Sequence, residues 1–298
     1  MGSGEVSKFV DSQSAESYSC IFIRTYDSKG DFMRLIDLSS TLDPHDRDLL
    51  PPAMAAAAGV VAPRVDYSHP ATPDGRDRFC HFFGCSHDDL PDGEGWGSEV
   101  LNDMSSHCGT HVDAPLHSGS TCEGRTSRTI DQVELNELFC PGKVLDVRPW
   151  AQPGQAIPLD ALRQALAAVG EPIRPGDAVL IRTGQERYRL GEPAFFQYPG
   201  MSREGTLFLS EQGATVLGTD AVGWDRPFAV MAQAFKDTGD KQQLWDGHKA
   251  IREKEAFIVQ QLCNLGALPL RGFHVGFFPL KLARASAAPA RAVAFLSH

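Results

Sequence analysis

The chain has 298 residues, of which 42% are hydrophobic and 22% are charged, as is ordinary for a soluble globular protein. Its formal net charge of −10 and pI near 5.4 argue against nucleic acid or an anionic membrane as a partner. No apolar run is long enough to span a bilayer, and the N-terminus lacks the pattern of a signal peptide. The seven scattered cysteines form no C-x-x-C pair, which favours reduced thiols in the cytoplasm.

The first hundred residues are mostly polar or irregular. Residues 1–30 are predicted to be a flexible N-terminal arm, and residues 31–298 a single domain. The stretch "MRLIDLS" (33–39) predicts the first strand. Residues 43–100 are rich in Pro, Gly, Asp and His, which is typical of a long lid or binding loop.

Strands and helices alternate through the second half. Strands are predicted at 142–150, 177–184, 256–262, 272–282 and 291–296. Leu159, Leu162, Leu166 and Val169 share one face of a predicted helix, with Gly170 as its stop. Ser210 is expected to cap the start of the segment 210–225, and residues 231–239 and 241–255 to be helical at least in part. This alternation predicts an α/β fold.

The stretch "HCGTHVDAPLH" (107–117) carries the strongest chemical signal. His107, His111 and Asp113 offer two imidazoles and a carboxylate within seven residues, a donor set that suits Zn²⁺ or Mn²⁺. Gly109 and Pro115 disfavour a regular helix. We therefore expect an extended segment in which His111 and Asp113 share one face.

His117 comes next in this stretch, beyond the proline. We expect it to stay off the metal and to carry a proton, because the unperturbed pKa of histidine is roughly 6.5. Two other interpretations are a solvated His-rich loop and a structural metal site. The lack of a set of cysteine ligands weakens the second of these.

The stretch resembles H-x-G-T-H-x-D-x-P-x-H, the signature of the cyclase-family metal-dependent hydrolases. That family includes bacterial kynurenine formamidase, isatin hydrolase and some aromatic polyketide ring cyclases. "LIDLSSTL", "GDAVLIRTG", "LGTDAVGWD" and "NLGALPLRGFHVGFFPLKL" resemble further family segments, so the likeness extends from about residue 33 over most of the chain. It implies an α/β fold of swivelling β/β/α type, with mixed sheets in a half-barrel flanked by helices. It also implies a homodimer or homotetramer in which N-terminal segments reach a neighbour's active site.

By position, the resemblance makes His107, His111 and Asp113 metal ligands and His117 the catalytic acid/base. The resemblance makes His248 the ligand of a second metal, where a second metal is present. Without the resemblance, a surface histidine would be the favoured interpretation of His248. The chain departs from the family at Ser40, where a histidine is usual, and at Gln260, where a glutamate is usual, unless the register places Gln261 there. A neutral amide is a poor bridge between two cations. One divalent ion per chain, Mn²⁺ or Zn²⁺, is therefore expected, with Gln260 among its ligands, as the isatin hydrolase branch is similar in using a glutamine and one manganese.

The function that the resemblance favours is metal-dependent opening of a cyclic amide or formamide on a small aromatic substrate. The alternatives are a polyketide ring cyclase or dehydratase and a catalytically inactive metal-binding homologue. The substrate pocket is expected to be lined by aromatic residues on loops and by a carboxylate-binding arginine, although each of these residues could equally pack in a core or a lid. The candidates are Phe82, Phe83, Trp96, Trp224 and Arg182, with Phe195, Phe196 and Phe228 as further aromatic residues.

Overall fold

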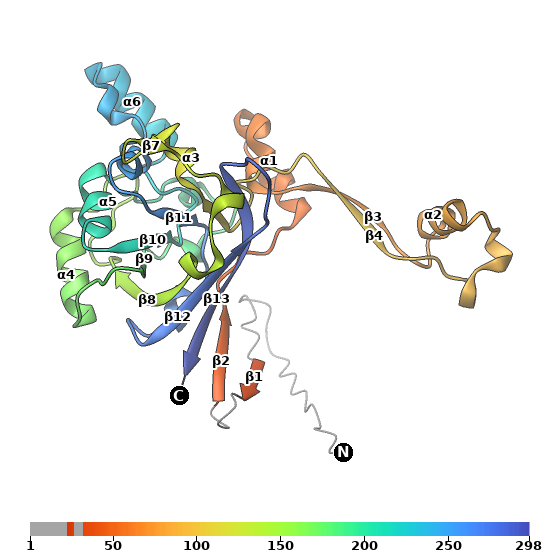
Figure 1. Cartoon of the computed structure of the whole chain (residues 1–298). Helices are drawn as coiled ribbons and strands as arrows, with labels where there is room; N and C mark the ends of the chain where they lie inside the picture. Colours follow the sequence, from red (N-terminus) through yellow and green to blue (C-terminus); the bar gives the residue numbers. More distant parts are fainter. Residues whose placement is uncertain (1–22, 27–31, 298) are drawn as a thin grey trace.

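The computed structural model describes residues 23–26 and 32–297, and its centre is a nine-stranded mixed sheet (Figure 1). The strand order is β1-β2-β13-β12-β8-β9-β10-β11-β5, and β5 pairs with β13 as well as with β11. Seven strands from β13 to β5 therefore close into a barrel, where a half-barrel was expected. The expected mixed α/β fold is confirmed.

The strands of this sheet are β1 (Ile23–Tyr26), β2 (Phe32–Asp37), β5 (His111–Asp113), β8 (Phe139–Asp146), β9 (Asp177–Arg182), β10 (Ala214–Thr219), β11 (Phe257–Gln260), β12 (Phe273–Pro279) and β13 (Ala287–Ser297). Two small ribbons pair β3 (Arg64–Ser68) with β4 (Ser98–Asn102) and β6 (Thr121–Cys122) with β7 (Arg125–Thr126). The helices are α1 (Ala58–Val61), α2 (Pro73–Phe83), α3 (Pro115–Ser118), α4 (Leu159–Val169), α5 (Arg203–Ser210), α6 (Phe228–Thr238) and α7 (Asp246–Lys249). None of the helices in the described ranges is long and apolar enough to cross a membrane.

The predicted strands and the first predicted helix are confirmed with small shifts at their ends. Gly170 ends α4 in the left-handed conformation, with φ 76°, which glycine adopts without strain. The expectation for Ser210 is wrong: it is the last residue of α5, and its hydroxyl donates back to the carbonyl of Thr206. Ser202 caps this helix instead, by accepting the N–H of Gly205. Of the predicted N-terminal arm, only β1 lies within the described residues.

Two apolar layers lie on either side of the barrel wall. Side chains alternate along β9, so that Leu180 packs inside the barrel while Val179 and Ile181 pack outside. The outer layer lies against α4, where Leu162 and Val169 are buried. The strands β8, β9, β10 and β11 are parallel, and the crossovers between β8, β9 and β10 contain α4 and α5.

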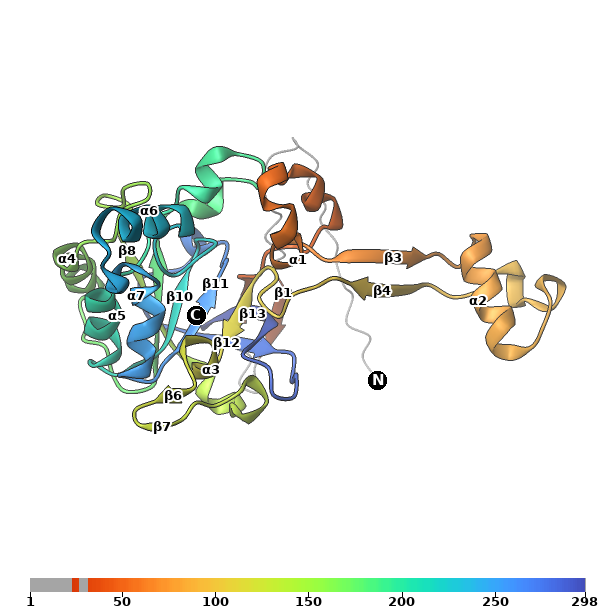
Figure 2. The same cartoon turned by 90° about the horizontal axis from the view of Figure 1, so that it is seen from above.

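Residues 64–102 form an arm that projects from the body in both views (Figures 1 and 2). The antiparallel ribbon β3–β4 is its stem, and α2 lies at its tip. The tip packs tightly, because a Cβ on Gly95 would lie 2.1 Å from the carbonyl oxygen of Gly75. The arm therefore contains regular elements where an irregular loop was expected.

Candidate metal site

The pairing of β5 with β11 gathers three polar side chains on one face of the barrel wall. His111 lies opposite Gln260, and Asp113 lies opposite Ile258. Val112, between the two, enters the barrel core. His111 and Asp113 therefore point to the outer face, with Gln260 beside them. The predicted extended segment with these two side chains on one face is confirmed.

His107 reaches the same point from the turn that precedes β5. Gly109 takes φ 62° in this turn, and a Cβ there would lie 2.3 Å from a methyl carbon of Leu42. The Nε2 atoms of His107 and His111 lie 3.4 and 3.5 Å from Oδ1 of Asp113. That oxygen is buried and accepts no hydrogen bond from the described residues. Two imidazole nitrogens thus converge on an unsatisfied carboxylate oxygen.

His117 approaches from α3, which Pro115 opens at its first position. Its Nδ1 lies 2.9 Å from Nε2 of His107. Among the described residues, His107, Asp113 and His117 form a group of potential metal ligands whose donor atoms all lie within 4.8 Å of one another. His117 therefore belongs to the cluster, immediately beside the His107 nitrogen.

Gln260 contacts the carboxylate. Its Nε2 donates to Oδ2 of Asp113 at 2.7 Å, and its Oε1 accepts the Trp224 N–H at 3.0 Å. Because a backbone N–H can only donate, this contact fixes which end of the amide faces Asp113. In this arrangement Gln260 holds Asp113 in place, and its oxygen is already engaged.

His248 completes the cluster from α7. It is 3% exposed, so the alternative of a surface histidine is wrong. Its Nε2 lies 3.4 Å from Oδ2 of Asp113 and forms no hydrogen bond within the described part of the chain. Its Nδ1 contacts Asp225, which also accepts the backbone N–H groups of Gly247 and His248. Asp225 ends the segment "LGTDAVGWD", but its contact with His248, 23 residues away, was not predicted.

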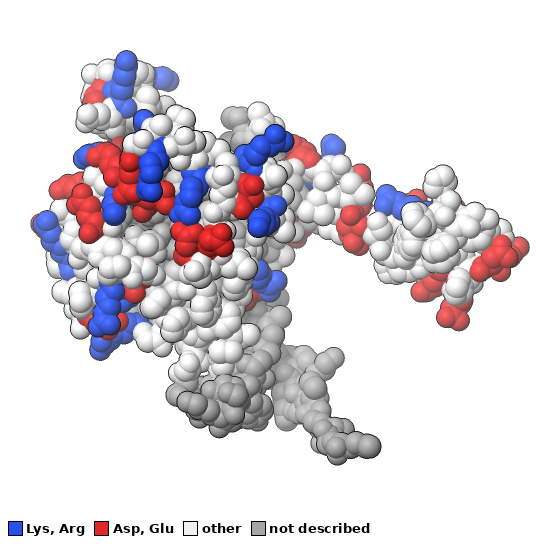
Figure 3. All heavy atoms as spheres, viewed as in Figure 1, with Lys and Arg blue, Asp and Glu red and all other residues white. Residues whose placement is uncertain are grey.

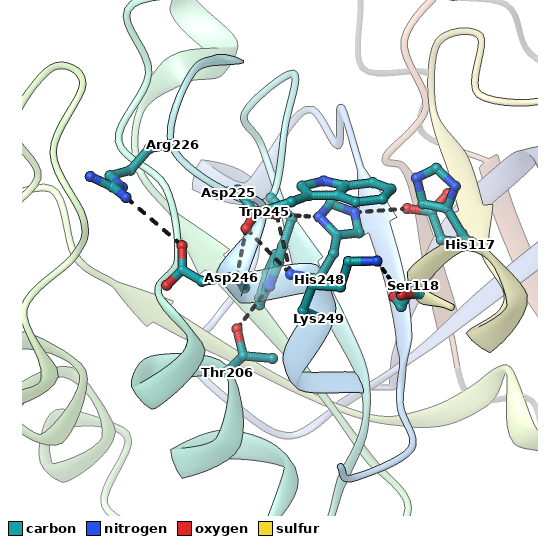
Figure 4. A network of polar contacts seen from close by, with 12 residues as sticks. His117, Ser118, Thr206, Asp225, Arg226, Trp245, Asp246, His248 and Lys249 are labelled. Atoms are coloured by element: carbon teal, nitrogen blue, oxygen red, sulfur yellow. Dashed lines mark hydrogen bonds and ion pairs between the residues drawn. The ribbon is translucent and has the colours of Figure 1, made fainter. Parts of the chain in front are cut away.

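Trp245 and Lys249 cover the histidines on the outer side (Figure 4). The Trp245 ring lies 4.8 Å from the ring of His117 and 4.7 Å from that of His248. Lys249 Nζ lies 5.4 Å from the Trp245 ring centre and donates to the carbonyl of Ser118 at 3.1 Å. Trp245 has φ 61°, a conformation uncommon for a bulky residue. Neither residue was expected at the site.

Burial and mutual charge shift the protonation equilibria of the cluster. Burial alone would raise the pKa of Asp113, but His111 and His248 hold it well below its ordinary value. Burial lowers the pKa of His117 to about 3. Burial would also lower the pKa of His248, but the Asp225 and Asp113 carboxylates raise it to about 9.

The donor set fits a divalent cation. An ionised, buried Asp113 oxygen and the adjacent imidazole nitrogens provide the oxygen and nitrogen donors that Zn²⁺ and Mn²⁺ accept. A cation between them would satisfy a carboxylate oxygen that the described residues leave without a donor. The residues present therefore match the group that the sequence predicted.

The predicted pocket residues do not gather around the histidines of their own chain. Phe82, Phe83 and Trp96 lie together on the arm. Trp224 is a core residue, 1% exposed, and its indole N–H donates to Thr206. The structure thus corrects the expectation for Trp224: its ring faces the outer apolar layer and fills it.

Arg182 is also placed differently from the prediction. It shares the barrel-side face of β9 with Leu180, whereas the histidine cluster lies on the outer face of the wall. It pairs with Asp146 at 3.6 Å and with Glu186 at 3.9 Å. These two carboxylates match the alternative that Arg182 pairs with structural acids.

Comparison with known proteins gives consistent likenesses. The Cyclase family model matches residues 36–226. The isatin hydrolase of Roseibium aggregatum is 26% identical over 210 residues, covering 67% of this chain and 74% of that protein. The kynurenine formamidase of Paracidovorax citrulli is 30% identical over 192 residues, covering 64% and 76%. A crystal structure of an isatin hydrolase bound to the product analogue thioisatinate is similar in fold, with a TM-score of 0.64, 23% identity and coverage of 89% and 93%.

Proposed function

The chain belongs to the Cyclase family, and on that premise we propose that it is a metal-dependent hydrolase that cleaves a cyclic amide or formamide of a small aromatic substrate. The names of the two sequence relatives support amide hydrolysis. The observation that carries the proposal is the unsatisfied Oδ1 of Asp113 between His107 and His111. Such an arrangement of buried donors suits a cation that takes part in chemistry.

We assign His107, His111 and Asp113 to one divalent ion per chain, Mn²⁺ or Zn²⁺. When bound, such an ion lowers the pKa of a water molecule and polarises the carbonyl of the substrate. Gln260 keeps Asp113 in position through its 2.7 Å hydrogen bond. His248, held by Asp225, directs its Nε2 towards the same carboxylate. An amide at position 260 adds no negative charge, which favours one cation over two.

His117 is the proton carrier in this proposal. Burial keeps its imidazole neutral at pH 7, so that one ring nitrogen has a lone pair for a proton. Its Nδ1 faces His107, and we assign Nε2 to proton transfer. The water oxygen bonds to the carbonyl carbon while His117 takes the water proton. When the C–N bond breaks, His117 returns this proton to the leaving nitrogen, giving an amine and a carboxylic acid.

We also propose that the arm joins two copies of the chain. Phe82 and Phe83 are 74% and 59% exposed, and on the stem Tyr67 and Leu101 are 62% and 56% exposed. An isolated two-stranded ribbon is marginally stable in water, so this apolar surface needs a partner. A homodimer or homotetramer that buries the arm would bring the aromatic residues of the tip to a neighbour's surface, where they could line its substrate pocket.

Light scattering tests this assembly. The native protein should have a mass of at least twice the 32.4 kDa of one chain. Phe82→Ser combined with Phe83→Ser should shift it towards the monomer. Phe139→Ser, which changes a phenylalanine that is 46% exposed on β8, is the matched control. A native monomer would contradict the proposed assembly.

A cytoplasmic location remains part of the proposal. Six of the seven cysteines lie in the described part of the chain, and all six are free thiols. Free thiols suit a reducing compartment.

Turnover tests the proposed reaction. The protein should be supplied with Mn²⁺ or Zn²⁺ and assayed with isatin and with N-formylkynurenine, whose ring opening and deformylation change the absorbance. Hydrolysis of either compound supports the proposal. If a metal-loaded protein cleaves neither of them but closes a ring on a poly-β-ketone substrate, the cyclase alternative is correct. Metal binding with no turnover of any of these favours the inactive homologue.

A further inference from the structure

A polar cavity lies next to α7, the helix that carries His248. It has a volume of about 540 Å³ and opens between the start of α5, the segment 241–244, α7 and the β6–β7 hairpin. On the face drawn in Figure 3, blue Lys and Arg side chains crowd together with red Asp and Glu side chains below α6. The charged residues that line the cavity are Arg203, Lys241, Lys249, Arg252, Asp246 and Glu253.

The cavity carries an excess of positive charge. Four cationic side chains line it against two carboxylates, in a chain whose net charge is −10. Glu253 neutralises Arg203, with Nε and Oε1 2.7 Å apart. Lys241 and Lys249 have no carboxylate partner among the described residues. Two ammonium groups are therefore left to attract an anion.

Lys249 connects this cavity to the candidate active site. It follows His248 in the chain, and its Nζ contacts the carbonyl of Ser118, the residue after His117. The Trp245 ring lies 5.4 Å from this Nζ and 4.8 Å from the His117 ring. A small molecule held at Lys249 would thus lie close to the residues that surround the proton carrier.

We propose that this cavity binds the anionic end, a carboxylate or a phosphate, of the substrate whose amide is cleaved at the histidine cluster. The inference rests on the proposed function and narrows its substrate class to aryl amides that carry a negative charge. Lys241 and Lys249 supply the attraction, and Arg252 is a further cation in the lining. The cavity discriminates between substrates by their charge, so it adds no affinity for a neutral aryl amide.

A pair of amides that differ only in charge tests this. Formanilide is neutral, and 3-formamidobenzoate has the same scissile group with an added carboxylate. Lys241→Met should raise KM for 3-formamidobenzoate about three- to tenfold and leave kcat/KM for formanilide unchanged. Lys236→Met, an exposed lysine on α6 outside the cavity, is the matched control and should change neither. Equal effects of Lys241→Met on both amides, or no effect, would overturn the inference.

A binding measurement separates this inference from the proposed function. The fluorescence of 2-aminobenzoate reports binding without turnover, and Lys241→Met should raise its Kd by a similar factor. If neither amide is cleaved, the proposed function fails, while the change in Kd still decides whether the cavity binds anions. Inorganic phosphate at constant ionic strength should compete with 3-formamidobenzoate only. Phosphate could instead change the rate of formanilide hydrolysis, and Lys241→Met could abolish that change. The cavity would then bind a free anion, and its assignment to the anionic end of the substrate would be wrong.

Discussion

Nε2 of Gln260 donates to Oδ2 of Asp113 at 2.7 Å across the pair of strands β11 and β5. This hydrogen bond joins the position at which the sequence resemblance leads us to expect a glutamate to the carboxylate at the centre of the cluster. It places a neutral amide where a glutamate would put a second negative charge. The number of cations that the site can hold therefore depends on this position.

Gln260→Glu should raise the metal content from one towards two ions per chain, because a second carboxylate offsets the repulsion between two dications. Without metal, the same variant should unfold about 2–5 kcal/mol more easily, since two buried carboxylates would face each other. Elemental mass spectrometry and thermal unfolding of the metal-free protein measure the two effects. A variant that still binds one ion and unfolds like the wild type would contradict this role.

Asp225→Asn should weaken metal binding about 10- to 100-fold, as losses of the partners of metal-binding histidines do. The amide would present an N–H to Nδ1 of His248, so the imidazole would carry its proton on Nε2, the atom that faces Asp113. Competition with a chelator gives the affinity. Asp240→Asn, at an exposed cap outside the cluster, is a matched control. Unchanged affinity in Asp225→Asn would show that His248 does not act on the cation.

His117→Ala should keep the metal and lose about 10²- to 10⁴-fold in kcat, the usual contribution of a positioned acid or base. Metal content and turnover should be measured on the same sample. Loss of the metal instead would make His117 a ligand, as its place in the group with His107 and Asp113 allows.

The sequence predicts the site better than its surroundings. The extended segment of β5 follows from Gly109, Pro115 and the alternation around Val112, all of which are local. The contact of Asp225 with His248 could not be predicted, because a pairing across 23 residues leaves no periodic signal. The place of Trp245 could not be predicted either, because a bulky residue at positive φ leaves no such signal. The sequence predicts an irregular segment here because the two strands of the arm are only five residues each and pair across a 29-residue insertion that carries α2.

Stability should respond to the protonation of Asp220. Burial raises its pKa to about 6, although the carboxylate accepts three hydrogen bonds from Thr183 and Gly184. The folded state thus holds the proton more tightly than the unfolded chain, whose carboxyl has a pKa near 3.8. Protonated Asp220 therefore adds to the free energy of unfolding. This contribution is complete below about pH 4 and is lost as the pH rises through about 6. A pKa difference of about two corresponds to about 3 kcal/mol.

Asp220→Asn removes this titration. Its free energy of unfolding should therefore lack the decline between pH 4 and pH 6 that Asp220 adds to the wild type. The variant should also be less stable at pH 4, because its amide N–H group would face the Gly184 N–H. Urea unfolding at several pH values gives the difference between the two proteins. A constant difference across this range would show that Asp220 does not titrate there.

The most direct test of the account is the metal content of the native protein, purified without a polyhistidine tag. Turnover of isatin and of N-formylkynurenine should be measured on the same sample before and after metal removal. We predict one manganese or zinc ion per chain, hydrolysis that stops on removal and returns on readdition, and no bound ion in Asp113→Ala. A native protein that binds no divalent ion, or an Asp113→Ala variant that retains a full complement, would contradict the central claim.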